Sequence, residues 1–535
     1  MTSPTAWLND AVIYEIYPQS FLDSNGDGIG DLPGAITKLD YLQWLGINTI
    51  WFNPCFASPF IDAGYDVADY MTIAPRYGTN DDMIKFVDEA AKRGIRVLLD
   101  LVVGHTSTDH QWFQAEIHEA PSAELGDRYI WAVEPRLDNV EADVLKTTPW
   151  VASPGSRREH YLKNFFEAQP ALNFGYARMH PEEPWRQSID APGPMRNRAA
   201  LKEILAFWLD RGVAGFRVDM AFSLVKDDEG QVETMKLWRE LRGWLDENYP
   251  SAVIIPEGVD GSDAEHQAFH GDFFLVIGGE HLSLFNNGGA GKLPWAPEPN
   301  PYFGQAGTGS IKTFVENWNH VRERSPQRPV IVATADHDFA RLASGDRTPE
   351  QLGVAFTFLL TWGSVPSIYY GDEIGMRFQP DMPNKEGAVC FPGFYNRAGV
   401  RTPMHWDTTA NAGFSTASAH ELYLPIDPDA DRVNVEQQLS DPHSTLHLLR
   451  ELIAIRHAHP ALGTHTQAEI LHADYPLIYL REDSILVVLN PSGQRGVASI
   501  SGYENAEPLI NHGVEISSNE IAIEPFGFGI FTLFD

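Results

Sequence analysis

Three segments of the chain repeat one order of helix, glycine and strand. Residues 32–54, 79–103 and 199–220 each begin with apolar residues at helical spacing, pass through Gly46, Gly94 or Gly212, and end in an apolar run. Glycine suits the left-handed residue that ends a helix, and parallel strands covered on both faces are apolar throughout. Each segment is therefore predicted to be a helix–strand unit of a parallel sheet.

Five further runs extend this pattern. They are residues 12–18, 252–258, 273–278, 329–336 and 367–373, which bring the strand candidates to eight, with helical patterns between them. Parallel strands that alternate with helices in this number are typical of a (β/α)₈ barrel, or TIM barrel. The predicted fold class is therefore α/β.

Two regions depart from the pattern, as expected for a chain of 535 residues. Residues 104–174 contain no clear helix–strand unit, which predicts an insertion domain after the third strand. Residues 464–535 contain short alternating runs separated by Gly, Asn and Pro, typical of an antiparallel β domain. The predicted organisation is a barrel over 1–103 and 175–460, an insertion domain over 104–174, and an antiparallel β-sandwich over 461–535.

The chain carries 39 Lys and Arg against 73 Asp and Glu, a net charge of −34. This composition argues against nucleic acid and anionic membranes as partners. Cys55 and Cys390 lack metal-ligand spacing and are expected to be free, buried thiols. The sequence shows no signal-peptide pattern and no apolar run near about 18 residues, so we expect a cytoplasmic protein. The oligomeric state stays open.

The stretch GFRVDM (215–220) places Arg217 and Asp219 in an otherwise apolar strand. Residues two apart point to the same side of a strand, so both side chains should face the barrel interior. A structural ion pair is the alternative interpretation.

Polar residues also follow other predicted strands: Asp100 with His105, Glu257, and His337 with Asp338. In a (β/α)₈ barrel these positions meet at the carboxyl-terminal rim, where active sites form. Each residue alone would more often be a cap, a turn former or a hydrogen-bonded histidine. Carboxylates gathered on one rim repel one another, so the joint arrangement favours catalysis.

Two opposed carboxyl groups can break a glycosidic bond when one attacks the anomeric carbon and the other protonates the leaving oxygen. Asp219 has Arg217 beside it to keep it ionised, which suits the nucleophile. Glu257 follows the apolar run 253–256, and apolar surroundings would raise the pKa of its carboxyl. We predict Asp219 as nucleophile and Glu257 as acid/base, with carboxyl groups about 5–5.5 Å apart.

The ordered motifs resemble the α-amylase superfamily of retaining α-glycoside hydrolases and transglycosidases, from about residue 10 to at least 410. DLVVGH (100–105), GFRVDM, the glutamate of IIPEG and HD (337–338) resemble its central motifs, and AGYDVADY (63–70), QPALN (169–173) and GSVPSIYYGDEIG (363–375) resemble flanking ones. The resemblance implies that Asp338 is the third catalytic carboxylate. It also implies that His105, Arg217 and His337 bind the sugar and that Tyr65 stacks beneath it.

Two motifs, FIDAGYD (60–66) and RTPMHWD (401–407), resemble the branch of oligo-1,6-glucosidases, α-glucosidases, trehalose synthases and amylosucrases. In that branch the matching acid and arginine close the non-reducing end of the site. The resemblance therefore implies that Asp62 and Arg401 close a pocket for one terminal glucose. The alternative is an exposed turn acid and a surface arginine.

These features predict a retaining, exo-acting α-glucosidase for short α-glucosides, working through a covalent β-glucosyl–aspartate. The alternative is a transferase or isomerase, trehalose synthase-like or sucrose-active, in which a sugar hydroxyl intercepts the same intermediate. A non-catalytic carbohydrate-binding or interaction protein is a remote alternative. Departures from the family motifs at Gly104, Asp336 and Ala171 leave linkage and acceptor preference open.

The loop DSNGDGIGD (23–31) spaces oxygen atoms as a hard-cation site does. The ligands would be the side chains of Asp23, Asn25, Asp27 and Asp31 and the carbonyl of Ile29. Position twelve is Gly34, so the distal glutamate of an EF-hand is missing, and a solvated acidic turn is the alternative. The resembling branch has a calcium loop of this kind, which implies a structural Ca²⁺ remote from the chemistry, and we expect no organic cofactor.

Overall fold

The computed structural model describes residues 3–133, 135, 147–257, 268–274, 280–285, 300–324, 326, 328–345, 347–390 and 395–533. Within these residues, eight parallel strands form one sheet in the order β10-β9-β5-β2-β1-β13-β12-β11. They are β1 (Ile13–Ile16), β2 (Thr49–Phe52), β5 (Arg96–Val102), β9 (Gly215–Asp219), β10 (Val253–Pro256), β11 (Asp272–Phe273), β12 (Val330–Ala333) and β13 (Val365–Tyr369). Most of the predicted strand 273–278 lies outside the described residues.

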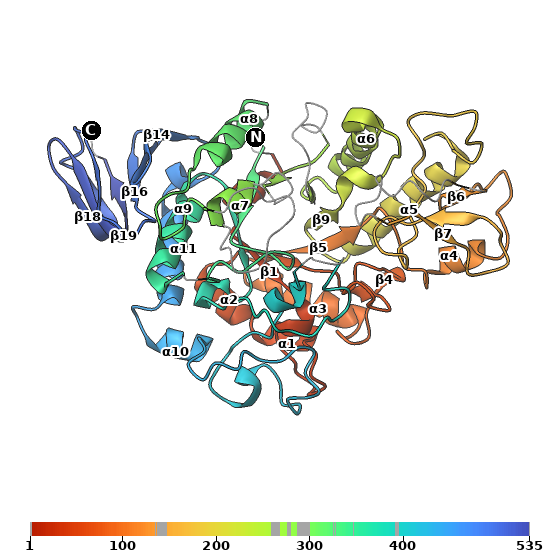
Figure 1. Ribbon diagram of the computed structural model, residues 1–535, viewed down its shortest axis with the longest axis horizontal. Coiled ribbons are helices and arrows are strands. Elements are labelled where there is room, and N and C mark those ends of the chain that lie inside the picture. The colour runs from red at the N-terminus through yellow and green to blue at the C-terminus, as the bar shows by residue number, and fades with distance from the viewer. Residues whose placement is uncertain are drawn as a thin grey trace.

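The last strand, β13, pairs with the first, β1, so the sheet curves into a barrel and the predicted (β/α)₈ fold is confirmed. In the described residues, helices lie between successive strands except between β10 and β11 (Figure 1). They are α1 (Leu32–Thr37), α2 (Leu39–Leu45), α3 (Asn80–Lys92), α5 (Pro192–Leu209), α6 (Val232–Asn248), α7 (Glu280–Phe285), α8 (Lys312–Arg324) and α9 (Pro349–Thr361), and α10 (Val435–Ser440) and α11 (Thr445–Ala458) follow the last strand.

The local signals that predicted these units are present. Gly46, Gly94 and Gly212 have φ of 98°, 73° and 88°, the left-handed conformation in which glycine avoids the strain of a side chain. Thr79 caps α3 through a capping box with Asp82. The first predicted helix is instead two short helices, α1 and α2, that meet at Lys38.

The barrel interior changes from apolar to polar along the strands. Ile13, Leu98 and Val253 lie in an apolar cluster inside the barrel. Two residues further along on the same face are Glu15 on β1 and Asp100 on β5, and Arg217 on the neighbouring β9 pairs in register with Asp100. Their exposed fractions are 0%, 1% and 2%, so these ionisable groups lie in the interior, beneath the carboxyl-terminal rim.

Two smaller sheets lie at opposite ends of the molecule's long axis (Figure 1). The segment 104–174 contains α4 (Gln111–Glu116) and a three-stranded sheet, β6 (Trp131–Ala132), β8 (His160–Leu162) and β7 (Trp150–Ala152), in that order. A short pair, β3 (Phe56–Ala57) and β4 (Asp69–Ile73), precedes it. The exact domain boundaries stay predictions.

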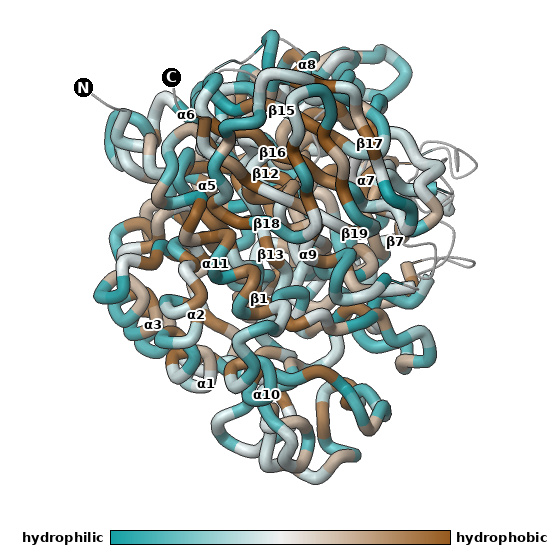
Figure 2. Tube along the Cα trace, turned by 90° about the vertical axis from the view of Figure 1, so that its left-hand side faces the viewer, coloured by the Kyte–Doolittle hydropathy of each residue, from teal (hydrophilic) through white to brown (hydrophobic). Residues whose placement is uncertain are grey.

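The C-terminal region is antiparallel, as predicted. It contains β14 (Ala468–Ala473), β15 (Leu477–Arg481), β16 (Ile485–Leu489), β17 (Gly496–Ala498), β18 (Glu507–Ile516) and β19 (Ile521–Thr532). Ile478 and Leu486 belong to a core within this region, whereas Tyr479 and Val487 pack into the barrel core. The hydrophobic colouring of β15 and β16 in Figure 2 reflects these two buried faces.

Cys55 and Cys390 are free thiols, but only Cys55 is buried and Cys390 is half-buried. In the part of the chain that the structure describes, no helix has both the length and the apolar content needed to cross a membrane.

Candidate active site

Arg217 is the centre of the candidate site. Its Nη1 lies 3.0 Å from Asp100 Oδ1 and 3.0 Å from Asp219 Oδ1, and its Nη2 lies 2.6 Å from Glu257 Oε1. Because a single guanidinium contacts Asp219 and Glu257, the two carboxyl groups face the same narrow space. The ends of β9 and β10 thus bring the predicted nucleophile and acid/base together.

The residue after Asp219 helps to place Glu257. Met220 has a φ of 42°, an uncommon left-handed conformation for a residue with a side chain. This turn lets the Met220 N–H donate a hydrogen bond of 3.1 Å to Glu257 Oε2. Glu257 is therefore held at both oxygens, by Arg217 and by the backbone that follows the nucleophile.

The charges of the pair differ from the sequence-based expectation. Burial and the neighbouring Glu257 raise the pKa of Asp219 well above its usual value, and Arg217 offsets this only in part. Its guanidinium is shared with Asp100 and Glu257, so it does not neutralise Asp219 alone. The expectation that Glu257 has apolar surroundings is also wrong, because its side chain is 20% exposed and paired with Arg217.

Tyr65 and His337 lie beside this pair. Their rings stack at a centroid distance of 5.3 Å, Tyr65 Oη is 2.7 Å from His337 Nε2, and the same hydroxyl donates to Asp100 Oδ2 at 3.0 Å. Burial lowers the pKa of His337 well below its usual value, so the imidazole is neutral. Three of the predicted sugar-binding residues, Tyr65, His337 and Arg217, thus form one hydrogen-bonded group through Asp100.

Asp338 lies between two arginines. Its Oδ1 accepts hydrogen bonds from Arg397 Nη1 at 2.8 Å and from Arg401 Nη2 at 2.9 Å. Burial opposes ionisation, but the guanidinium groups of Arg397 and Arg401 outweigh it and hold the pKa of Asp338 well below its usual range. Asp338 is therefore an ionised carboxylate at ordinary pH.

The structure pairs Asp62 with an arginine other than Arg401, the one expected to close the pocket with it. Asp62 is buried, but its arginine is Arg397, whose Nη2 lies 3.4 Å from Asp62 Oδ1, and Gln169 Nε2 donates to Asp62 Oδ2 at 2.8 Å. Arg401 donates instead to the His337 carbonyl, at 2.9 Å, and to Asp338. Sequence reasoning missed Arg397, although it stands four residues before Arg401 in the same buried turn.

His105 is buried and uses both ring nitrogens within the protein. Nε2–H donates to the Tyr65 carbonyl at 3.0 Å, and Nδ1 accepts from Asn164 Nδ2 at 3.0 Å. Burial lowers the pKa of His105 to about 4. A Cβ at Gly104 would lie 2.6 Å from Asn164 Nδ2, so glycine there leaves room for this amide. His105 therefore supports Tyr65, and Asn164 is a neighbour of the site that the sequence did not indicate.

The acidic loop 23–31 is an ordered turn. Asp23 accepts hydrogen bonds from the backbone N–H groups of Asn25, Gly26 and Gly28, and Asp31 caps α1 through Gly34 N–H. In the described residues, no three Asp, Glu, His or Cys side chains converge closely enough to hold a metal ion. A calcium site here would need the Asn25 and Ile29 carbonyl oxygens, which are oxygen donors of the kind that Ca²⁺ prefers.

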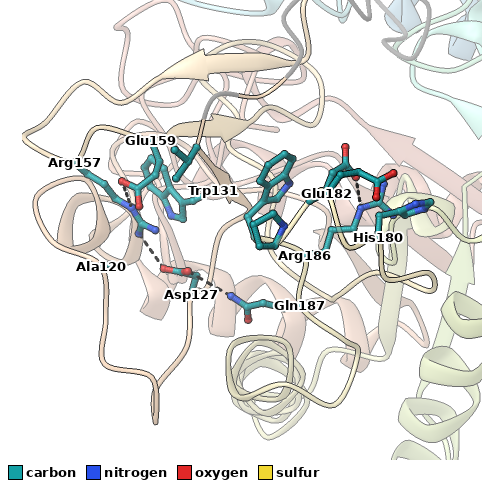
Figure 3. Close-up of a pocket in the computed structure, with 13 residues that line it drawn as sticks. Ala120, Asp127, Trp131, Arg157, Glu159, His180, Glu182, Arg186 and Gln187 are labelled. Atoms are coloured by element: carbon teal, nitrogen blue, oxygen red, sulfur yellow. Dashed lines mark hydrogen bonds and ion pairs between the residues drawn. The ribbon is translucent and has the colours of Figure 1, made fainter.

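A separate cavity of about 930 Å³ lies beside the small sheet of the 104–174 segment (Figure 3). Arg157 lies between Asp127 and Glu159, 2.9 Å and 3.3 Å away, and Arg186 pairs with Glu183 at 2.5 Å. The described residues that line it include none of the predicted catalytic residues. Its arginines are already neutralised by neighbouring acids.

A barrel with opposed carboxyl groups at its carboxyl-terminal rim defines a class of enzymes that act on glycosidic bonds. Residues 15–465 match the model of the alpha-amylase catalytic domain. The chain belongs to the alpha-amylase family and is a glycosidase or transglycosidase of that family.

Relatives in this family have different reaction names. The chain is 32% identical to "Trehalose synthase/amylase TreS" of Mycolicibacterium smegmatis, over 90% of this chain and 82% of that protein. It is also 32% identical to "Glucan 1,6-alpha-glucosidase" of Streptococcus pneumoniae, over 93% of each chain. The crystal structure of the alpha-glucosyl transfer enzyme XgtA matches with a TM-score of 0.81 and 26% identity, covering 99% of this chain and 100% of that one.

Proposed function

We propose that the protein is a retaining, exo-acting α-glucosidase for short α-glucosides. The observation that carries this proposal is the single guanidinium of Arg217 in contact with both Asp219 and Glu257. Two acids held so close, around one cation, can divide the roles of nucleophile and proton donor.

In the proposed first step, an Asp219 oxygen attacks the anomeric carbon and the bond to the leaving oxygen breaks. Glu257 gives its proton to that oxygen, and a β-glucosyl ester of Asp219 remains. In the second step, Glu257 takes a proton from water, the water oxygen attacks the anomeric carbon, and α-glucose leaves. The coupled pair must hold one proton in total, with that proton on Glu257 when substrate is bound.

The exo character is supported by the end of the site formed by Asp62, Asp338 and Arg397. Arg397 contacts both acids, and Gln169 holds the second oxygen of Asp62. Charged groups fixed by one another present rigid acceptors and donors, which suit the hydroxyl groups of a terminal glucose. A substrate whose sugar chain continued past this glucose would have to displace the Asp62–Arg397 pair.

Transfer of glucose to another sugar is the second candidate. It is favoured by the names of the relatives, which include a trehalose synthase and an α-glucosyl transfer enzyme. In this case a sugar hydroxyl replaces water in the second step, and Glu257 deprotonates that hydroxyl. The same pair of acids serves both outcomes.

We also propose that the loop 23–31 binds a structural Ca²⁺ through Asp23, Asn25, Asp27, Asp31 and the Ile29 carbonyl. The alternation of oxygen-bearing side chains supports it. The ion would stabilise the folded chain and take no part in the reaction.

Product analysis tests the main proposal. The enzyme is incubated with α-1,1-, α-1,2-, α-1,4- and α-1,6-linked glucose disaccharides or sucrose, and with 4-nitrophenyl α-glucoside. Release of glucose as the α-anomer, without new disaccharides, is expected for a retaining hydrolase. Formation of new disaccharides would instead support the transferase, the second candidate. Release of β-glucose would exclude a retaining mechanism.

A further inference from the structure

Glu15 is a buried carboxyl group that the proposed mechanism does not use. Its Oε1 lies 2.9 Å from His337 Nδ1, and the Asn53 amide Nδ2 lies 3.0 Å from both of these atoms. The Glu15 side chain is 0% exposed, and Oε2 lacks a hydrogen-bond partner among the described residues. These polar atoms form a tight triangle shielded from solvent, so the positions of their protons are restricted.

One arrangement of protons avoids a clash. A hydrogen on His337 Nδ1 would place two donors against each other, because the Asn53 amide also points there. With no hydrogen on either Nδ1 or Glu15, two lone pairs would meet at 2.9 Å. A hydrogen on Glu15 removes both conflicts, because the carboxyl then donates to Nδ1 and still accepts from Asn53.

The other side of the imidazole leads to the same arrangement. Asp100 accepts hydrogen bonds from Arg217 at Oδ1 and from Trp51 Nε1, 3.3 Å away, at Oδ2. Tyr65 therefore points its own proton at Asp100, and its lone pair must accept from His337 Nε2–H. The contacts on both sides of the His337 ring therefore require its hydrogen to be on Nε2.

We infer that Glu15 is a positioning residue that donates a proton to His337 Nδ1 and so fixes the Nε2–H form of the histidine. This role rests on the proposed function, in which His337 contacts the sugar. The fixed form lets His337 donate from Nε2, first to Tyr65 and then to a sugar hydroxyl. The chain of hydrogen bonds continues through Asp100 to Arg217 and hence to the catalytic pair.

The charged and titratable groups around Glu15 agree with a neutral carboxyl. Burial, followed by the nearby Asp336, raises the pKa of Glu15 well above its usual value, more than Asn53 and Arg217 lower it. The other groups that face it are Asp100 on β5, His337 and, on β13, Tyr369. Burial thus favours the protonated form of both neighbouring acids, Glu15 and Asp336.

Two substitutions test whether Glu15 acts on His337 as a neutral proton donor or as a negative charge. Glu15→Gln keeps a neutral donor for Nδ1 and gives up only the acceptor for the Asn53 N–H, so kcat/KM with 4-nitrophenyl α-glucoside should stay within about fivefold of the wild type. Glu15→Ala removes the donor, and kcat/KM should fall by about 10–100-fold, the range seen when a group that orients a ligating histidine is lost. Glu373→Gln is a matched control, since Glu373 is also 0% exposed but is hydrogen-bonded to Tyr14 and Tyr41.

A spectrum of the wild-type enzyme gives a readout that needs no turnover. Two-bond ¹⁵N–¹H NMR of histidine-labelled protein should show His337 with hydrogen on Nε2, its signals being assigned by their loss in His337→Gln. Hydrogen on Nδ1 overturns the inference, as does a Glu15→Gln variant as slow as Glu15→Ala, or a fully active Glu15→Ala. If the wild type cleaves no α-glucoside, the proposed function fails, while the spectrum still decides the state of His337.

Discussion

Arg397 Nη2 lies 3.4 Å from Asp62 Oδ1, although 335 positions separate the two residues in the chain. The same guanidinium binds Asp338 through Nη1, at 2.8 Å. Arg397 therefore joins the acid of the pocket end to the acid that is proposed to grip the sugar. This bridge exists only because a turn after β13 returns to the rim of the barrel.

Arg397→Lys should weaken substrate binding, because an ammonium group cannot span two carboxylates as a planar guanidinium does. We expect KM for short α-glucosides to rise at least about tenfold, which corresponds to about 1.4 kcal/mol, with a smaller change in kcat. Steady-state kinetics measure it. Arg450→Lys, on the exposed face of α11, is the control. An unchanged KM would contradict the role of Arg397 at the pocket end.

Asp219→Asn should abolish turnover, because an amide cannot form the glucosyl ester. A loss on the order of 10⁴-fold or more in kcat is expected, the scale observed when one member of a catalytic set is removed. The measurement is release of 4-nitrophenol from 4-nitrophenyl α-glucoside. Asp88→Asn, an exposed position on α3, should keep full activity. Appreciable turnover in Asp219→Asn would refute the nucleophile assignment.

The periodic units made the barrel predictable, since a helix, a left-handed glycine and a buried strand are all local patterns. Contacts between residues far apart in the chain are harder to predict from the sequence. Arg217 and Asp219 were recognised because two charges in one apolar strand are conspicuous, whereas Glu15 is a single acid in IYEI. Only the closed barrel shows that Glu15 lies against His337 from the distant β12 loop.

The charged and polar contacts of the site also could not be predicted from local sequence patterns. The apolar run before Glu257 indicated a buried acid, yet its side chain turns toward Arg217 and stays 20% exposed. Asn164 comes from the 104–174 segment, whose irregular sequence gives no register from which its contact with His105 could be inferred. Pairings of this kind depend on the closed fold, which the sequence predicts only as a class.

Asp336 should make stability depend on pH in the opposite sense to an ordinary paired acid. Burial and Asp338 raise its pKa to about 8, whereas an unfolded Asp titrates near about 3.9. Between these values the unfolded chain has lost a proton that the folded chain keeps, so this contribution to stability is lost as pH rises from about 4 to about 8.

In the structure, the Asp338 N–H donates a hydrogen bond of 2.8 Å to Asp336 Oδ1. Asp336→Asn removes the titrating carboxyl and keeps an oxygen that can accept this hydrogen bond. The melting temperature of the variant relative to the wild type should therefore increase between pH 5.5 and pH 8, by at least about 2 °C. Thermal unfolding followed by circular dichroism measures this difference. With Asp88→Asn the difference should not change with pH, and a constant difference for Asp336→Asn would show that this carboxyl titrates normally.

Calcium should raise the melting temperature if the loop 23–31 binds it. A ligand that binds only the folded state stabilises it by about 2.7 kcal/mol at 100 times its Kd. Chelation with EGTA should therefore lower the melting temperature, and added Ca²⁺ should restore it, while kcat at 25 °C stays unchanged. Asp27→Ala should remove this response, because it deletes one proposed ligand from an exposed part of the loop. A response that persists in Asp27→Ala would place the calcium elsewhere, and no response in the wild type would leave the loop as an acidic turn held by its own hydrogen bonds.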